Sequence, residues 1–271
     1  SGSSSSGGNA AGTDGRTGVL AIDVGNTHIT CAFMEGAEIR LLRRVSTEDC
    51  LSGSAFLDLL DLDGKPVPER IVICSVRRAA TGAICRGFRE GLGISPFVVS
   101  NDTPMGITTS YRSMDTLGTD RLVDAAACHH LYSGGRAPGI VIDMGTATTV
   151  DCITEAGEFL GGAIVPGLLS AYRGLLAAAP ELPDIAISPV ENLIGATTKE
   201  CLRSGVIAGH AALIRELSSL MAARLGKKPL VVVTGGLARV IDALLPADYV
   251  RDEHLTVKGL SIIHAINTRN G

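Results

Sequence analysis

Short apolar runs closed by glycine turns open the patterned part of the chain. The run VLAIDV, at 19–24, leads into a glycine turn, and the β-branched run HITCAFME, at 28–35, follows at once. Two such runs separated by a short turn predict a β-hairpin. Beyond it, the spacing of apolar positions predicts a strand at 38–45, a helix near 51–62, a strand at 70–76, a helix at 79–92 and a short strand at 96–100.

The second half of the chain repeats this theme. An apolar run at 139–144 leads into two or three strands joined by glycines, over 145–167, and a helical pattern at 120–132 connects the halves. The other elements predicted here are helices at 168–178, 198–225 and 240–245 and a buried strand at 229–234. Strands mixed with helices in both halves indicate the α/β class.

One motif occurs in both halves. The segments IDVGNT, at 22–27, and IDMGTA, at 142–147, each end an apolar strand with Asp-x-Gly and a small hydroxyl or amide residue. Because each half offers a carboxylate at the end of a strand, the repeat predicts a binding cleft between two similar units.

Composition excludes several classes of function. The 24 Lys and Arg against 28 Asp and Glu give a net charge of −4, which provides no basic field for nucleic acid. The longest stretch without a charged residue is the 14 residues from Phe159 to Tyr172, so we expect no membrane span. The seven cysteines form no C-x-x-C pair, which favours a cytoplasmic protein with reduced thiols. Residues 1–16, which begin SGSSSSGG, are interpreted as a disordered leader.

The two Asp-x-Gly turns suggest phosphate chemistry. A strand that delivers an Asp into a tight glycine turn places a carboxylate beside exposed backbone N–H groups and a hydroxyl, which together hold a phosphate and its metal ion. A single copy is more often an ordinary turn. Two copies in corresponding positions favour a site, and the absence of G-x-x-x-x-G-K-[ST] and G-x-G-x-x-G argues against a P-loop or a simple dinucleotide fold.

A set of motifs over nearly the whole chain beyond the leader resembles type III pantothenate kinase. The motifs are DVGNT at 23–27, SV at 75–76, Tyr111 with LGTDR at 117–121, DMGTATTVD at 143–151, GGAIVPG at 161–167 and TGG at 234–236. The resemblance implies the acetate and sugar kinase, heat-shock chaperone and actin superfamily, with two ribonuclease-H-like domains, 17–119 and 120–271, flanking a nucleotide cleft. It also implies ATP-dependent phosphorylation of pantothenate to 4′-phosphopantothenate, the first step of coenzyme A biosynthesis.

Residue roles follow from the same resemblance. It implies a first phosphate loop of Asp23, Gly25, Asn26 and Thr27, a second of Asp143, Gly145, Thr146 and Thr149, an adenosine-side turn of Thr234, Gly235 and Gly236, and a pantothenate side of Tyr111, Gly118, Asp120 and Arg121. Asp23 and Asp143 would hold the metal. Asp120 would be the base that takes the proton of the attacking hydroxyl. Arg121 would pair with the pantothenate carboxylate or with the developing charge.

A plainer interpretation of two of these positions stays open at the level of sequence. The pair formed by Asp120 and Arg121 also fits a charged helix N-terminus with a salt bridge. Asp151, two residues beyond the second loop, either coordinates a cation or faces solvent.

The resemblance further implies Mg²⁺, a monovalent cation (K⁺ or NH₄⁺) and a homodimer. Three departures from the family pattern bear on the substrate: Met114 replaces a Pro, Ala179 replaces a Thr associated with the acceptor, and Thr197 with Thr198 replaces an Asn-Thr pair. They leave two alternatives, a catalytically weak accessory or regulatory protein of the same fold and a kinase for another small alcohol.

Overall fold

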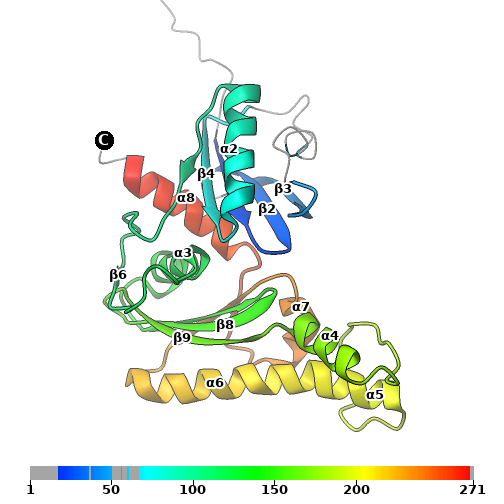
Figure 1. Cartoon of the computed structure of the whole chain (residues 1–271). Helices are drawn as coiled ribbons and strands as arrows, with labels where there is room; N and C mark the ends of the chain where they lie inside the picture. The colour runs from blue at the N-terminus through cyan, green and yellow to red at the C-terminus, as the bar shows by residue number, and fades with distance from the viewer. Residues whose placement is uncertain (1–17, 37, 51–55, 57–59, 61–66, 269–271) are drawn as a thin grey trace, which may run out of the picture.

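The computed structural model describes residues 18–36, 38–50, 56, 60 and 67–268. The proposed leader and, apart from Phe56 and Leu60, the helix expected near 51–62 lie outside these residues. Figure 1 shows two sheets, one above the other, with helices between and around them.

The first sheet contains the predicted hairpin and its extension. Its strands are β1 (Val19–Val24), β2 (His28–Glu35), β3 (Glu38–Ser46), β4 (Arg70–Ser75) and β5 (Phe97–Val98), in the order β3-β2-β1-β4-β5. The strands β1, β2 and β3 pair antiparallel, whereas β4 pairs parallel to both β1 and β5. Helix α2 (Arg78–Leu92) covers the outer face.

The second sheet has the same plan. Its strands are β6 (Thr108–Thr109), β7 (Gly139–Met144), β8 (Ala147–Ile153), β9 (Glu158–Pro166), β10 (Leu230–Thr234) and β11 (Val250–Arg251), in the order β11-β10-β7-β8-β9-β6. The run β9-β8-β7-β10-β11 repeats the pairing directions of β3-β2-β1-β4-β5. The sequence repeat therefore corresponds to a repeated sheet.

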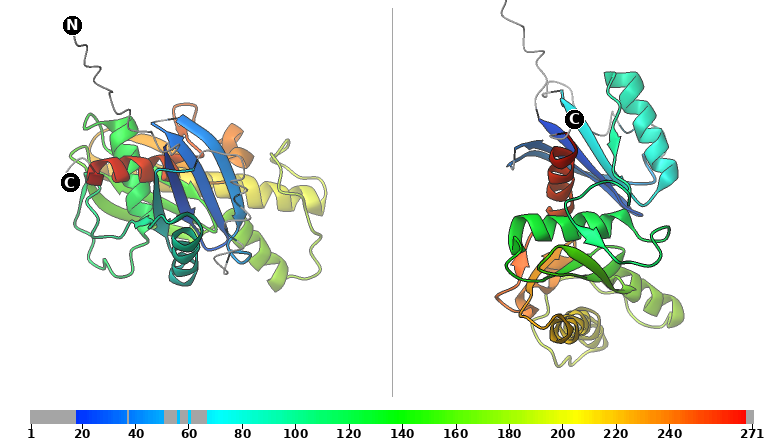
Figure 2. Two further views of the ribbon diagram at one scale, coloured as in Figure 1. Left: turned by 90° about the horizontal axis from the view of Figure 1, so that it is seen from above. Right: turned by 90° about the vertical axis from the view of Figure 1, so that its left-hand side faces the viewer.

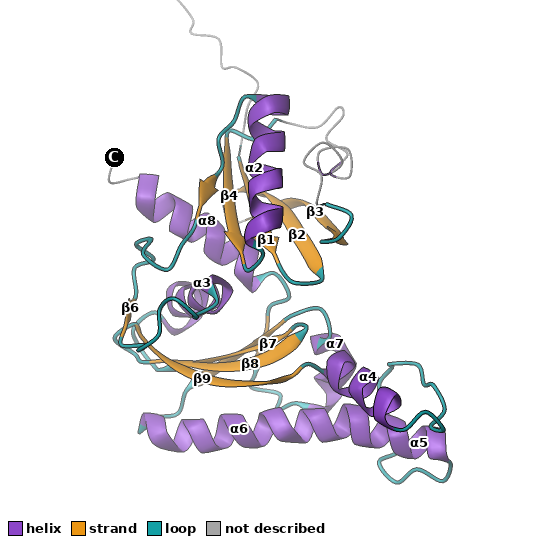
Figure 3. Ribbon diagram, in the orientation of Figure 1, coloured by secondary structure: helices purple, strands orange, loops and turns teal. Residues whose placement is uncertain are grey.

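Two helices separate the sheets, α3 (Thr119–Cys128), which continues as a π-helical turn (His129–Ser133), and α8 (Leu255–Thr268). Figures 2 and 3 show the same sandwich from other sides and by element type. The apolar spacing of the sequence did not predict α8. This helix packs against the first sheet although it is the last element in the sequence that the structure describes. The domain boundary at 119 and 120 therefore stays a prediction, because helices from the second half complete the core of the first.

Alternation along β1 decides where the first carboxylate lies. Ala21 packs inward with Cys74 against α3 and α8, while Ile22 and Ile73 pack outward against α2. Because successive side chains on a strand point to opposite faces, Asp23 falls on the inner face, toward the second sheet.

The remaining helices lie beyond the second sheet. They are α4 (Leu168–Ala178), a continuous run of α5 (Thr198–Arg203), a π-helical turn (Ser204–Ala208) and α6 (Gly209–Leu225), and the short α7 (Ala238–Ile241) with a 3₁₀ turn (Asp242–Leu244). In the described part of the chain, the 198–225 run is the one helix long and apolar enough to cross a membrane, where the sequence led us to expect none. Core helices of soluble proteins pass the same test, and Ile207, Ala211 and Ile214 pack in the core beneath the second sheet.

The crossing of α3 and α8 generates a stability prediction. A Cβ on Gly259 would lie 2.8 Å from the Val123 carbonyl oxygen and 3.0 Å from the Ala127 Cβ, so Gly259→Ala forces the helices apart. We expect it to lower the free energy of unfolding by ~1–3 kcal/mol in urea titrations. The matched control is Gly209→Ala, where a Cβ meets nothing within 4 Å; it should be neutral or stabilising by up to ~1 kcal/mol. Equal effects of both variants would contradict the packing argument.

Candidate functional site

The two Asp-x-Gly loops meet. The Thr27 Oγ1 and Thr146 Oγ1 atoms are 2.9 Å apart, although 119 positions separate them in the sequence. Asp23 and Asp143 each occupy the fifth position of a six-residue strand, β1 and β7, one residue before the strand ends. We call Asp23, Thr27, Asp143 and Thr146 the loop junction.

Backbone hydrogen bonds give the two loops their shape. The Gly25 N–H donates to the His28 carbonyl at 3.0 Å, and the Gly145 N–H donates to the Ala147 carbonyl at 3.1 Å. The buried Thr47, which sequence reasoning missed, supports the first loop because its hydroxyl donates to the Gly25 carbonyl at 3.0 Å. Asn26 is exposed, and its carbonyl accepts a hydrogen bond from Arg77.

Helix α3 brings a third carboxylate to the junction. Asp120 lies in the first turn, and its Oδ1 accepts a hydrogen bond from the Arg121 N–H at 2.9 Å. Gly118 precedes the helix because a side chain there would collide with Asp120 Oδ1. One turn further on, Asp124 has 4% of its surface exposed, and its Oδ1 has no hydrogen-bond partner among the described residues.

Burial and neighbouring carboxyl groups raise the pKa values of these four carboxyl groups. Burial raises the pKa of Asp23 to about 8, and the charges of Asp120 and Asp143 add to the effect while Arg44 opposes it. Burial and Asp120 raise the pKa of Asp143 to about 7. Burial also raises the pKa of Asp120, against the lowering influence of Arg121, and holds the pKa of Asp124 well above its ordinary range. The cluster therefore favours any cation that can enter it.

The donor set fits Mg²⁺ bound together with phosphates. No group of three or more His, Cys, Asp or Glu side chains with metal-binding geometry exists in the described ranges. Mg²⁺ in nucleotide sites usually takes one or two carboxylates plus phosphate oxygens and water, which is what Asp23 and Asp143 can supply. The unpartnered Asp124 Oδ1 adds an unmatched acceptor beside them.

Arg121 forms a buried ion pair. Its Nε donates to Asp151 Oδ2 at 2.9 Å, its Nη2 donates to Asp151 Oδ1, and the two side chains are 7% and 3% exposed. The guanidinium lies 5.7 Å from the ring centroid of Tyr111 and 5.8 Å from that of Phe159. The expectation that Asp151 binds a cation or faces solvent is wrong, because Arg121 takes both of its oxygens and burial removes them from water. A role for Arg121 toward the substrate stays a prediction.

One glycine beside Tyr111 and one in the predicted adenosine-side turn allow close approach. Gly161, with φ of +87°, lets the Tyr111 ring approach, because a Cβ there would lie 2.9 Å from the ring. Gly235, with φ of +91°, lies against the second loop, since its Cβ would be 2.6 Å from Asp143 Oδ1. Thr234 pairs with Asp143 across β10 and β7, and Thr149 pairs with Asp143 across β8 and β7. The adenosine-side turn and the second loop are therefore neighbours.

Two of the positions that depart from the family pattern lie at helix ends. Ala179 ends α4, where its N–H donates to the Leu175 carbonyl. Thr197 caps α5: its Oγ1 accepts from the Glu200 N–H at 3.3 Å, and Glu200 Oε2 accepts from the Ala196 N–H at 2.7 Å. This arrangement is a variant of the capping box, in which Glu200 reaches the residue before the cap. It gives Thr197 a structural role at the start of α5.

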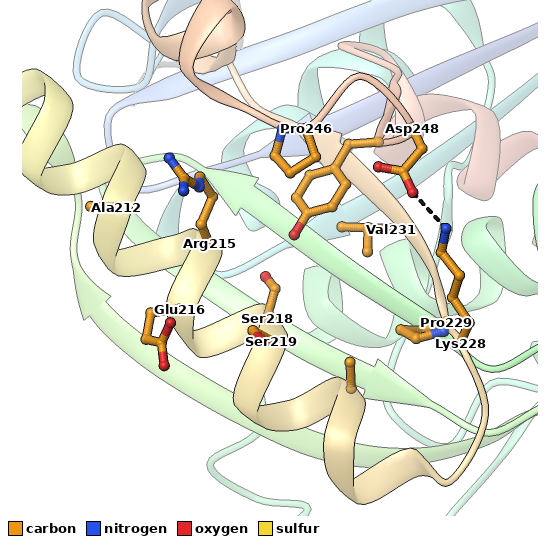
Figure 4. Close-up of a pocket in the computed structure, with 12 residues that line it drawn as sticks. Ala212, Arg215, Glu216, Ser218, Ser219, Lys228, Pro229, Val231, Pro246 and Asp248 are labelled. Carbon is orange, nitrogen blue, oxygen red and sulfur yellow. Dashed lines mark hydrogen bonds and ion pairs between the residues drawn. The ribbon is translucent and has the colours of Figure 1, made fainter.

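A cavity of about 580 Å³ lies on the other side of the second sheet, between α6 and β10 (Figure 4). Arg215, Ser218 and Tyr249 line it, and Lys228 Nζ donates to Asp248 Oδ2 at 2.8 Å beside it. It contains none of the residues that the sequence assigned to phosphate, metal or substrate. We therefore place the candidate site at the loop junction.

Known proteins resemble the chain over most of its length. Residues 19–220 match the family described as Type III pantothenate kinase. The Type III pantothenate kinase of Moorella thermoacetica is 34% identical over 262 residues, which are 92% of this chain and 100% of the relative. That of Roseiflexus castenholzii is 35% identical over 259 residues, 92% of this chain and 99% of the relative.

Solved structures agree on the fold. A protein described as a conserved Baf family transcriptional activator from Campylobacter jejuni superposes with a TM-score of 0.58 at 18% identity, covering 92% of this chain and 99% of its own. The polyphosphate/ATP-glucomannokinase of Arthrobacter sp. strain KM gives 0.50 at 14% identity, covering 94% and 100%. With the repeated sheet, these likenesses confirm the predicted actin-like α/β fold.

The raised pKa values predict that the nucleotide-free protein loses stability as the pH rises. Folded Asp23 and Asp143 hold protons to pH about 8 and about 7, whereas the unfolded groups release them near 3.8. Because the folded state binds protons more firmly, the free energy of unfolding should fall between roughly pH 4 and 8. Urea titrations across that range should show the fall, and Asp23→Asn should flatten it. Glu216→Gln, on the exposed side of α6, should keep the wild-type slope; a wild-type stability that climbs with pH would refute the argument.

Proposed function

The chain belongs to the type III pantothenate kinase family, and we propose that it transfers the γ-phosphate of ATP to the 4′-hydroxyl of pantothenate, the first step of coenzyme A biosynthesis. The observation that carries this proposal is the meeting of the two Asp-x-Gly loops beside Asp120. Phosphoryl transfer to an alcohol needs loops that hold the phosphates and a carboxylate that takes the proton of the alcohol. The two loops and Asp120, on a separate helix, can supply these parts.

Each part has a chemical role in the proposal. A nucleotide phosphate replaces the contact between the Thr27 and Thr146 hydroxyls and accepts hydrogen bonds from them and from loop N–H groups. Asp23 and Asp143 hold Mg²⁺, which supplies positive charge to the transferring phosphate. Asp120 accepts the proton of the pantothenate hydroxyl, and its raised pKa makes it a stronger base than an ordinary aspartate.

The acceptor side is held by the buried cluster around Arg121. Asp151 fixes the guanidinium in position, and Tyr111 and Phe159 exclude water from it. Arg121 orients the acceptor through its remaining donors, and Gly118 lets the substrate approach Asp120. A monovalent cation, K⁺ or NH₄⁺, belongs to the proposal through the family resemblance, as does a cytoplasmic location.

We further propose a homodimer that forms through α4 and α6. Leu175, Leu213 and Leu220 are 41%, 41% and 58% exposed, and an apolar groove lined by Leu175, Leu182, Leu202 and Leu213 runs between α4 and the α5–α6 run. A row of exposed leucines beside an apolar groove supports an interface with a second copy.

The deciding assay couples ADP release to NADH oxidation with pantothenate, Mg²⁺ and K⁺ or NH₄⁺. Turnover that depends on pantothenate supports the kinase. ATP binding without turnover would favour the accessory protein, and turnover with a different small alcohol would favour the third alternative.

Asp120→Asn tests the proposed base. We expect kcat to fall by ~10²–10⁴, because general-base catalysis contributes about that much, with the Kd for Mg-ATP unchanged. Asp102→Asn, an exposed aspartate in the loop before β6, is the control and should keep the wild-type kcat. Near-normal turnover of Asp120→Asn would remove it from this role.

Leu213→Glu tests the dimer. A charge in the proposed interface should halve the mass measured by size-exclusion chromatography with light scattering. Leu131→Glu changes a leucine of nearly equal exposure, 42%, after α3 and should keep the wild-type mass. A wild-type protein that elutes as a monomer would refute the interface.

A further inference from the structure

One arginine, Arg44, acts on the loop junction through its charge. Arg44 lies on β3, and its side chain is exposed. Among the residues that the structure describes, it makes no hydrogen bond or ion pair, yet its charge acts on Asp23, on Asp143 and on His28. A cation that influences both metal-binding carboxylates without being tied to either is available to another anion.

The register of the first sheet places Arg44 on the same face as Asp23. Asp23 pairs with Thr30, and Thr30 pairs with Arg44, so the three residues form a row across β1, β2 and β3. Residues directly opposite one another on neighbouring strands point to the same face. Arg43, the next residue on β3, pairs with Cys31 and therefore faces the opposite side, toward the core under α2.

The Arg44 guanidinium crosses to the second half of the molecule. An ideal Cβ on Gly236 would lie 3.0 Å from both Cζ and Nη2 of Arg44, and closer still to Nη1. The absence of a side chain at Gly236 is what admits the guanidinium. Arg44 thus reaches from the first sheet to the turn that follows β10, beside the second loop.

The two phosphate loops lack basic residues of their own. Neither 22–27 nor 142–149 contains a Lys or Arg, and both contain an Asp. A triphosphate brought to this place meets several partly buried carboxyl groups, so cations must offset the repulsion. One metal ion supplies part of the positive charge, and a planar guanidinium suited to paired phosphate oxygens can supply more.

We propose that Arg44 is a nucleotide-binding residue that contacts the phosphate chain of ATP and joins the first sheet to the Gly235-Gly236 turn when the nucleotide is bound. The proposal rests on the proposed function for the identity of the nucleotide. In this proposal Gly236 is the residue that makes room for the Arg44 guanidinium.

The test is isothermal titration of Mg-ATP without pantothenate, so that it does not depend on turnover. Arg44→Gln should raise the Kd by about tenfold or more, as expected for a lost charge-assisted contact. The matched control is Arg43→Gln, which removes the same charge from the same strand but on the opposite face, and should leave the Kd within about twofold. In steady state, Arg44→Gln should raise the KM for ATP and leave that for pantothenate unchanged.

Two more variants keep the test decisive. Arg44→Lys should recover part of the affinity, because it restores the charge without the planar fork. Gly236→Ala should weaken Mg-ATP binding, and combining it with Arg44→Gln should add little, since both act through one contact. Melting temperatures of the nucleotide-free variants establish that each is folded.

The outcomes separate this proposal from the proposed function. A wild-type protein that binds Mg-ATP but does not phosphorylate pantothenate would refute the function and leave the Arg44 measurement intact. An Arg44→Gln Kd within twofold of wild type, an equal loss in Arg43→Gln, or a wild-type protein that binds no Mg-ATP would each overturn the role of Arg44.

Discussion

Four carboxyl groups near the loop junction, whose charges act across the two sheets, are the constraint on which the rest of the structure depends. Asp23 and Asp143 come from equivalent strands of two sheets, and Asp120 and Asp124 come from the helix between them. Burial raises the pKa of each, and repulsion from neighbouring carboxylates adds to it, so the fold stabilises their neutral forms. Such carboxyl groups become easier to ionise when cations lie beside them, so the site binds most favourably a ligand that brings cations with it. Phosphates bound with Mg²⁺ meet that condition.

The repeated sheet produces this gathering and also breaks its symmetry. In the first sheet the row through Asp23 continues to Thr30 and Arg44, and in the second the row through Asp143 continues to Thr149 and Ile164. The third position is therefore an arginine in one half and an isoleucine, 62% exposed, in the other. Because side chains alternate along a strand, a shift of one residue in either pairing would turn the whole row away from the junction. The two halves thus share a frame but contribute different chemistry.

Patterns within a short segment were predictable from the sequence, and, apart from the meeting of the two repeated loops, relations between segments were not. The hairpin at 19–35, the strands at 70–76 and 139–144 and the helix at 168–178 all appear, because apolar spacing and glycine turns act locally. The helix α8 was missed: its β-branched residues and Gly259 read poorly as helix, and Gly259 is there for the close crossing with α3. The two-residue strands β6 and β11 were missed because they are too short to show a period.

The same division holds for the candidate site. The motif residues Asp23, Thr27 and Thr146 were predictable because the repeat displays them, and the structure brings them together. Thr47, Arg44 and Asp124 were not, since their places depend on strand register and on helix packing rather than on any motif. Asp151 was misjudged for the same reason: its partner Arg121 lies 30 positions away.

In the proposed function, the two arginines of the site would act differently on the two anionic substrates. Arg121 is buried, stacked near two rings and held by both oxygens of Asp151, so most of its charge is already balanced and its position is fixed. Such a group orients a substrate more than it attracts one, because its electrostatic field is largely cancelled. Arg44 is exposed and reaches across from the other sheet to a glycine turn. Its charge acts on Asp23 and Asp143, whose raised pKa values favour the neutral carboxyl forms. In the proposal, a polyphosphate therefore gains more from Arg44 than from Arg121. In this proposal the acceptor side serves to place the substrate and the nucleotide side supplies charge. That arrangement suits a reaction whose barrier lies in moving a phosphoryl group between two negatively charged partners.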